Sequence, residues 1–131
     1  MSPKSNQSDI RCHKIRLVPT KEQEQFLLQA CGNRRHAYNY GIAWFHENIN
    51  KDSKDRTVFN SNLIRKEYTA KIDEQFPWIR KSSKEVFQEA FVDVTRSIDN
   101  FFKRCKNGKK KNLPKFATKN DSKQRFRINR K

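Results

Sequence analysis

The sequence has few glycines and few cysteines, and each shortage excludes a familiar kind of functional site. Its three glycines lie too far apart to build a phosphate-binding loop. The three cysteines, Cys12, Cys31 and Cys105, form no CxxC pair, and the histidines lie at no metal-ligand spacing. No spacing suggests a Ser/His/Asp or Cys/His catalytic arrangement either. The sequence therefore predicts no metal, no cofactor and no catalytic group.

Long apolar runs are also missing. No stretch reaches the 18 or more apolar residues that a membrane-spanning helix needs, and residues 1–9 lack the apolar core of a signal peptide. We therefore expect no membrane partner and a cytoplasmic location. Only 34% of the residues are hydrophobic, but ten Phe, three Tyr and two Trp concentrate apolar area in few positions. A small core is therefore expected.

Acidic residues are nearly absent from the last 29 positions, which carry 13 Lys and Arg against one acid, Asp121. This segment has a balance of +12, whereas the other 102 residues have a balance of only +4. Such a block, with Phe116 and Phe126 interleaved, favours contact with nucleic-acid phosphates over a solvated tail. The basic candidates in this segment are Lys109, Lys110, Lys111, Lys115, Arg125 and Arg127.

Helical periodicity dominates the middle of the chain. Thr20 with Gln23 forms a capping box that predicts a helix start, and Ser82 with Glu85 predicts another. Gly32 is either a break in the first helix or a close-packing point. A further helix is expected over 60–75, after a polar loop at 48–57. The expected core positions are Phe26, Leu27, Ala30, Cys31, Tyr38, Ile42, Phe45, Ile64, Tyr68, Ile72, Phe87, Ala90, Phe91, Val94, Ile98, Phe101 and Phe102.

Each end of the chain shows the alternation of a short strand. Over 10–18, Ile15 and Leu17 fall on one face and Lys14 and Arg16 on the other, and 125–129 alternates similarly. The expected fold is mainly α, with three to four helices between these strands. Two lone strands make a poor sheet in water. The pattern therefore indicates that the remaining strands are missing or come from another chain.

Several short motifs follow one another in the order found in TnpB (OrfB) proteins of insertion sequences. Residues 14–23 resemble the opening of that family, and Gly32, Arg35, Tyr38 and Asn39 fit its G-x-x-R-x-x-Y-N pattern. The later matches are Phe76–Ile79 to its W-[LI] anchor, Asn100–Phe102 to N-F-F, Leu113–Phe116 to P-[KR]-F and Arg125–Arg127 to S-F-R. From about residue 10 to the end, the chain resembles the N-terminal part of this family.

The resemblance implies a role in RNA-guided recognition of DNA. Family members are RNA-guided DNA endonucleases whose N-terminal part is often described as a helix-turn-helix domain. By the resemblance, residues 1–9 are a disordered N-terminus, 10–19 begin a wedge domain, 20–104 form the helical recognition domain, and 105–131 return toward an incomplete wedge barrel. The family's RuvC-like nuclease and zinc ribbon have no counterpart in these 131 residues. We therefore expect binding without DNA cleavage.

The resemblance also suggests particular contacts. Lys84 and Gln88 match a Lys and a Gln that face the adjacent-motif DNA, where Gln can bond adenine and Lys guanine or phosphate. Plain surface polarity is an equal alternative for both residues. Phe59 matches a Tyr that touches DNA in some relatives, but it lacks the hydroxyl. Lys14, Arg16 and Arg34 are weaker phosphate candidates. Arg35, Tyr38 and Asn39 are expected to be structural, with Arg35 bonding a helix end.

Three functional hypotheses remain open. The first is a TnpB-like module that binds double-stranded DNA and structured guide RNA. The second is a structural fragment that docks on a full-length TnpB-like protein. The third is a free-standing enzyme, which metal-dependent cleavage by the purified chain would support. A small stand-alone DNA-binding regulator of the helix-turn-helix kind is a sub-case of the first hypothesis, but residues 37–45 are too apolar for a reading helix. The last helix, around Lys84 and Gln88, is therefore the expected DNA-facing one.

Overall fold

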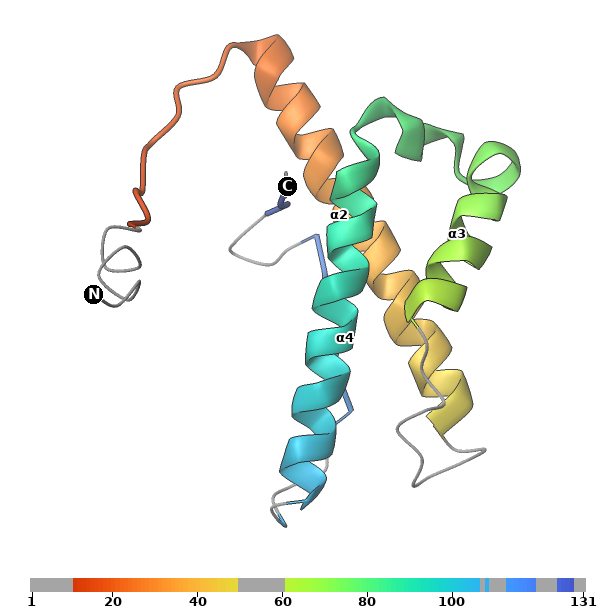
Figure 1. Ribbon diagram of the computed structural model, residues 1–131. Helices are drawn as coiled ribbons and strands as arrows, with labels where there is room; N and C mark the ends of the chain where they lie inside the picture. Colours follow the sequence, from red (N-terminus) through yellow and green to blue (C-terminus); the bar gives the residue numbers. More distant parts are fainter. Residues whose placement is uncertain (1–10, 50–60, 107, 109–112, 120–124, 129–131) are drawn as a thin grey trace, which may run out of the picture.

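The computed structural model describes residues 11–49, 61–106, 108, 113–119 and 125–128. Within these ranges the fold is all-α, with three α-helices and one short 3-10 helix. The elements are α2 (Lys21–Ile49), α3 (Ser61–Gln75), η2 (Pro77–Lys81) and α4 (Lys84–Lys106). The long helices α2 and α4 cross each other, and α3 lies beside them, connected to α4 through η2 (Figure 1).

Helix α2 begins at the predicted capping box. The Thr20 amide donates to Gln23 Oε1 at 3.0 Å, and the Gln23 amide donates to Thr20 Oγ1 at 3.3 Å. These two bonds satisfy backbone donors that the first turn leaves without helical partners. The helix continues through Gly32 as far as Ile49, so Gly32 is not a break. A loop was expected at 48–57, but residues 48 and 49 belong to α2, and residues 50–57 lie outside the described part.

Close packing was predicted at Gly32 as an alternative to a break, but the structure has it at Gly41. A Cβ atom at Gly41 would lie 2.8 Å from Val94 Cγ2 on α4, whereas one at Gly32 would meet only Arg35 Nη2 at 3.5 Å. Gly41 is buried, and Val94 is fully buried. The absence of a side chain at Gly41 therefore allows α2 and α4 to approach each other at their crossing.

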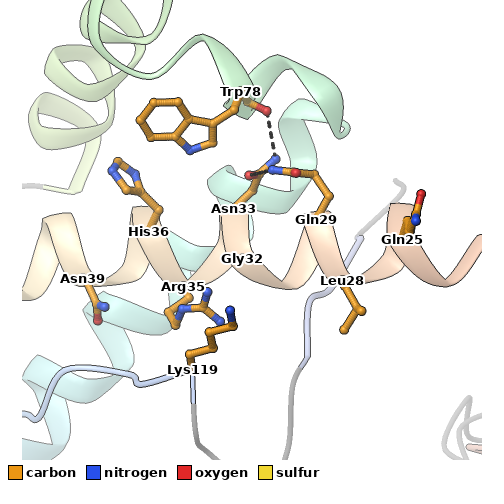
Figure 2. Close-up of a pocket in the computed structure, with 10 residues that line it drawn as sticks. All are labelled: Gln25, Leu28, Gln29, Gly32, Asn33, Arg35, His36, Asn39, Trp78 and Lys119. Atoms are coloured by element: carbon orange, nitrogen blue, oxygen red, sulfur yellow. Dashed lines mark hydrogen bonds between the residues drawn. The ribbon is translucent and has the colours of Figure 1, made fainter.

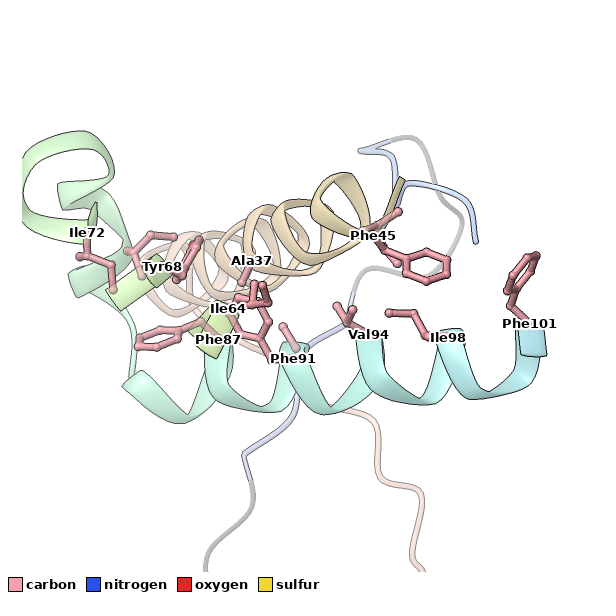
Figure 3. Close-up of a cluster of buried hydrophobic side chains, with 13 residues drawn as sticks. Ala37, Phe45, Ile64, Tyr68, Ile72, Phe87, Phe91, Val94, Ile98 and Phe101 are labelled. Atoms are coloured by element: carbon pink, nitrogen blue, oxygen red, sulfur yellow. The ribbon is translucent and has the colours of Figure 1, made fainter. Parts of the chain in front are cut away.

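The core lies between α2, α3 and α4 (Figure 3). The stripes predicted on α3 and α4 are confirmed, because every position is buried except Phe102, which packs against the core partly exposed. The prediction was wrong for Phe26, whose side chain is 56% exposed near the start of α2. It was half right for the anchors after α3, since Ile79 is buried but Trp78 remains 41% exposed.

Helix α4 begins one residue later than its predicted cap implies. Ser83 Oγ accepts from the Glu85 amide at 3.3 Å, so Ser83 caps the helix in place of Ser82. Ser82 Oγ instead accepts from Asn33 Nδ2 of α2 at 2.8 Å. A capping position was correctly located to within one residue, but the tertiary contact of Ser82 could not be read from local sequence.

The described residues contain no β-strand, which corrects the expectation of a strand at each end. Residues 11–20 are extended away from the helices, and nearly all of them are exposed (Figure 1). Residues 125–128 have no regular structure, and Asn129 lies outside the described part. An extended segment forms a strand only by exchanging backbone hydrogen bonds with a neighbour, and the described residues offer none.

Candidate nucleic-acid interface

The N-terminal end of α4 carries Lys84 and Gln88, the two residues that the resemblance to the TnpB family suggests as DNA contacts. Lys84 is the first residue of the helix and is exposed, and Gln88 lies one turn further along, partly exposed. Lys81, at the end of η2, is exposed just before them and was not among the predicted site residues. The first turn of a helix leaves backbone N–H groups without helical partners and carries a partial positive charge. Anions are therefore favoured at this end of α4.

Acidic side chains lie further along the same helix and are already paired. Arg127 bonds Asp93 Oδ1 at 3.0 Å and lies 3.5 Å from Glu89 Oε1. Arg127 was predicted to contact phosphate, but in this structure its charge is balanced by α4. These ion pairs hold residues 125–128 against the helix. The depression beside Gln88 therefore has mixed charge, with lining residues Arg65, Glu85, Gln88, Glu89, Val92, Arg96, Arg127 and Ile128.

Arg34 has a structural position. It is 8% exposed, its Nη2 atom lies 3.1 Å from Asp93 Oδ2, and its guanidinium carbon lies 4.6 Å from the centre of the Tyr38 ring. Tyr38 in turn bonds Ser97 of α4 at 2.8 Å. Arg34 therefore connects α2 to α4 through a partly buried ion pair, and this placement gives no support to a phosphate contact.

The basic segment 113–119 is anchored to α2 at two points. Asn39 donates to the Ala117 carbonyl at 2.9 Å and accepts from the Ala117 amide at 2.8 Å. His46 Nε2 bonds the Pro114 carbonyl at 2.7 Å, and its ring packs edge-on against Phe116. The segment therefore has a fixed path along α2. Lys115 lies within it and is exposed.

The other residues predicted to contact nucleic acid lie on separate segments or fall outside the described part of the chain. Lys14 and Arg16 are exposed on the extended segment 11–20, and Arg125 is exposed near α4. The structure does not bring these three together with Lys84. The predicted residues that fall outside the described part are Phe59, Lys109, Lys110 and Lys111.

A depression with many polar lining residues, called here the α2 trough, runs along one exposed face of α2 (Figure 2). It has a volume of about 830 Å³. Trp78 of η2 lies on one side of the helix, and Lys119 lies on the other side near Arg35 (Figure 2). The lining residues are Gln25, Leu28, Gln29, Gly32, Asn33, Arg35, His36, Asn39, Trp78 and Lys119.

Asn33 fixes the wall of the trough. Its side chain is buried and donates to the carbonyls of Trp78 and Ile79 at 3.5 and 3.4 Å, besides its shorter bond to Ser82. Its Oδ1 accepts from Gln29 Nε2 at 2.8 Å. A buried amide is stabilising when its donors and acceptor find partners. Asn33 thereby holds the backbone of η2, and with it Trp78, in place beside α2.

His36 is held in one protonation state. Burial lowers the pKa of His36, so the ring is neutral at pH 7. Burial also raises the pKa of Tyr68, whose hydroxyl lies 2.8 Å from His36 Nδ1. Because the buried Tyr68 proton needs an acceptor, Tyr68 donates to Nδ1, and the His36 proton resides on Nε2. His36 therefore contributes a neutral N–H donor among the residues that line the trough.

Sequence reasoning missed the trough because its residues come from three separate segments. Trp78 was interpreted as an apolar anchor, and Gln25, Gln29 and Asn33 drew no attention. One available signal was the row formed by three amides, one glycine and one histidine on one helical face, namely Gln25, Gln29, Gly32, His36 and Asn39. The contact of that face with Trp78 and Lys119 depends on pairings 40 to 90 residues apart, which no local pattern reveals.

The described residues include no group of three or more His, Cys, Asp or Glu side chains placed to hold a metal ion. Burial raises the pKa of Cys31, which keeps its thiol protonated. None of the described helices is long and apolar enough to cross a membrane.

Comparison with known families identifies the N-terminal third. Residues 10–54 match the family model of the helix-turn-helix domain of OrfB proteins from IS605 elements. This part of the chain belongs to the N-terminal helix-turn-helix domain of the OrfB/TnpB family. Among curated proteins and solved structures, no significant match was found.

The OrfB-type domain does not contain two short helices in its described part. Residues 11–20 are extended and 21–49 form the single helix α2, with no turn at Gly32. The family match indicates DNA binding and a link to transposable elements. The way in which DNA is contacted must therefore be derived from this geometry rather than from the name of the motif.

Proposed function

We propose that this chain is a nucleic-acid-binding module of an OrfB/TnpB-type protein, and that the N-terminal end of α4 contacts duplex DNA. The observation that carries the proposal is the exposed Lys84 and the partly exposed Gln88 in the first turns of a helix that is fixed in the core, with the exposed Lys81 three residues before the helix. A helix that enters the major groove commonly contacts bases with residues of its first turns. Resemblance assigns Lys84 and Gln88 to the same task.

The side chains at the N-terminal end of α4 suit two different kinds of contact with DNA, to phosphates and to base edges. Lys81 and Lys84 can neutralise phosphates, and the exposed start of the helix adds a favourable potential. Gln88 carries an amide that can bond adenine through two hydrogen bonds. Lys84 and Gln88 are about 6 Å apart along the helix axis, which is comparable to two base-pair steps. One helix end can therefore position itself on the backbone and contact base edges.

Helix α2 is a weaker candidate for reading duplex DNA. The middle of its inward face is buried against α4, and Arg34 is engaged with Asp93. Guide RNA would, by the same proposal, contact the basic segment 113–119 and the residues that follow it. The proposed role of these 131 residues is binding, since they contain no counterpart of the family's RuvC-like nuclease.

The test begins with selection of binding sequences from a randomised duplex pool, followed by fluorescence anisotropy at several salt concentrations. The logarithm of affinity should fall by roughly 0.9 per neutralised phosphate against log salt. Lys84→Ala should weaken all duplexes and reduce this slope, whereas Gln88→Ala should reduce discrimination at one base by about 1–3 kcal/mol. Lys21→Ala, an equal loss of charge at the start of α2, is the control.

Two results would contradict the proposal. Affinity that barely changes with salt would exclude a phosphate interface. Equal effects of Lys84→Ala and Lys21→Ala, with no loss of discrimination in Gln88→Ala, would remove the end of α4 from the interface.

A second candidate function is docking on a full-length relative. The observation that favours it is the extended segment 11–20, where Ile15, Leu17 and Val18 are exposed close to the exposed Phe26. An extended segment of this kind can add a strand to a partner's sheet. Light scattering of the chain mixed with a full-length OrfB protein distinguishes the two: a stable complex supports docking, and a mixture of free proteins contradicts it.

A further inference from the structure

The α2 trough combines features that the proposed contact at α4 does not use. Its centre is formed by α2, where Gly32 carries no side chain, and its sides are Trp78 of η2 and Lys119 of the basic segment (Figure 2). Its volume of about 830 Å³ falls in the range of pockets that hold small organic ligands.

Trp78 is a rigid ring that remains accessible. It is 41% exposed although its backbone is held by Asn33. Its ring packs edge-on against His36 and Phe76, at 5.6 and 5.9 Å between ring centres. Edge-to-face contacts fix the orientation of an aromatic ring, and 41% of Trp78 stays accessible beside them. Trp78 therefore offers a flat surface whose orientation is set before any ligand arrives.

Apart from Leu28, the side chains that line the trough around this ring are polar or cationic. The lining includes the amides Gln25 and Gln29, the neutral N–H donor of His36, and the cations Arg35 and Lys119, and none of its residues is acidic. An apolar protein partner would leave these amides and cations buried opposite apolar groups, which is costly. The surroundings instead suit a ligand with a flat ring, hydrogen-bonding edges and negative charge.

An unpaired nucleotide has this combination. Single-stranded nucleic acids are commonly held by stacking of bases on aromatic side chains, with basic residues along the backbone. We propose that the α2 trough binds one unpaired nucleotide of single-stranded RNA or DNA, with its base stacked on Trp78, its edge facing the amides of α2, and its phosphate beside Arg35 and Lys119. This inference rests on nucleic-acid binding by the chain, but not on Lys84 or Gln88.

Trp78 itself provides the readout. The chain has two tryptophans, Trp44 and Trp78, so Trp44→Phe leaves Trp78 as the sole source of tryptophan fluorescence. Short single-stranded RNA and DNA oligonucleotides should quench this emission in a saturable way. Oligonucleotides of equal charge that lack bases should not, because phosphate contacts alone leave the ring unstacked. The RNA and DNA arms identify which source binds more tightly.

Affinity measurements on variants complete the test. Trp78→Leu should weaken single-strand binding by about 5- to 150-fold, which corresponds to the loss of one stacked base. Trp78→Phe should restore part of the affinity, because a smaller ring still stacks. Phe26→Leu, which removes another exposed aromatic outside the trough, should leave it unchanged. Circular dichroism and duplex-DNA affinity of Trp78→Leu report whether the fold is intact.

The outcomes separate this site from the proposed function. The nucleotide site would be overturned if oligonucleotides bind without changing the emission of Trp78. It would also be overturned if oligonucleotides that lack bases quench this emission equally. Neither result would contradict nucleic-acid binding by the protein. Failure to bind any duplex or single strand would overturn both. If Trp44→Phe does not fold, fluorine-labelled tryptophan in the unaltered chain gives two resonances, and the site requires the one from Trp78 to shift.

Discussion

A methyl group added to Gly41, where α2 and α4 cross, should affect stability differently from a methyl group added to Gly32 in the same helix. Gly41→Ala would place a Cβ atom 2.8 and 3.0 Å from the two γ-carbons of Val94 and 3.4 Å from Phe91. Gly32→Ala, nine residues earlier in the same helix, would meet only the end of a flexible arginine at 3.5 Å. Both replace a glycine inside α2, so they share the same gain in helix propensity.

The magnitude follows from two opposing terms. Alanine in place of glycine in a helix interior stabilises by about 0.5–1 kcal/mol. Overpacking a well-filled core costs about 1–3 kcal/mol, and Val94 cannot rotate away easily because it is β-branched and fully buried. Gly32→Ala should therefore raise the free energy of unfolding by about 0.5–1 kcal/mol. Gly41→Ala should be neutral to destabilising by about 2 kcal/mol.

Urea denaturation followed by circular dichroism at 222 nm measures both changes. A double substitution, Gly41→Ala with Val94→Ala, makes the assignment specific. Because the shorter side chain removes the clashing methyl groups, the double variant should be more stable than the sum of the single effects by about 0.5–3 kcal/mol. If Gly41→Ala stabilises the protein as much as Gly32→Ala does, the close approach of the two helices at this point is refuted.

Two further predictions concern buried polar groups. Because burial lowers the pKa of His36, the unfolded chain binds this proton first, and the free energy of unfolding should fall as pH drops below about 6.5, with a slope of at most about 1.4 kcal/mol per pH unit. Urea melts across pH 5–8 check this, and His36→Gln should flatten the slope. Asp93→Asn should destabilise by about 2–4 kcal/mol because it leaves Arg34 buried without a carboxylate. The same change at Asp73, whose ion pair is exposed, should cost less than about 1 kcal/mol, and similar losses at both positions would contradict this account.

Local signals in the sequence predicted the helices well. The capping box at Thr20 and Gln23 forms as expected, because its two bonds join residues three apart. The stripes of α3 and α4 are buried because period 3.6 leaves one face for the core. These features depend on neighbours within one or two turns, which the sequence shows directly.

Features that depend on distant partners were not predicted. Arg34 is of a residue type that often binds phosphate, but its guanidinium is paired with Asp93, which lies 59 residues away in the sequence. The alternation at 10–18 is typical of a strand, yet a strand also requires a neighbour. Phe26 shares the spacing of core residues, but no described element covers the start of α2. Whether Lys84 and Gln88 contact DNA stays a prediction.

The two anchors of segment 113–119 have a consequence for how this region can change. On α2, Asn39 and His46 are seven residues apart, a rise of about 10.5 Å. Along the segment, Ala117 and Pro114 are three residues apart, which spans about 10 Å when extended. The two spacings are commensurate, and they run in opposite directions.

The hydrogen bonds of both anchors are made to the peptide backbone. An exposed side chain such as Lys115 can therefore be exchanged without loss of these bonds, whereas Phe116 also packs against the His46 ring. The number of residues between Pro114 and Ala117 cannot change in the same way, because one insertion or deletion would shift one of the two peptide groups by roughly 3.3 Å from its anchor. The length of segment 113–119 is therefore more strictly constrained than its composition. A lysine at an exposed position can be replaced by another residue type, but the position itself is fixed relative to α2.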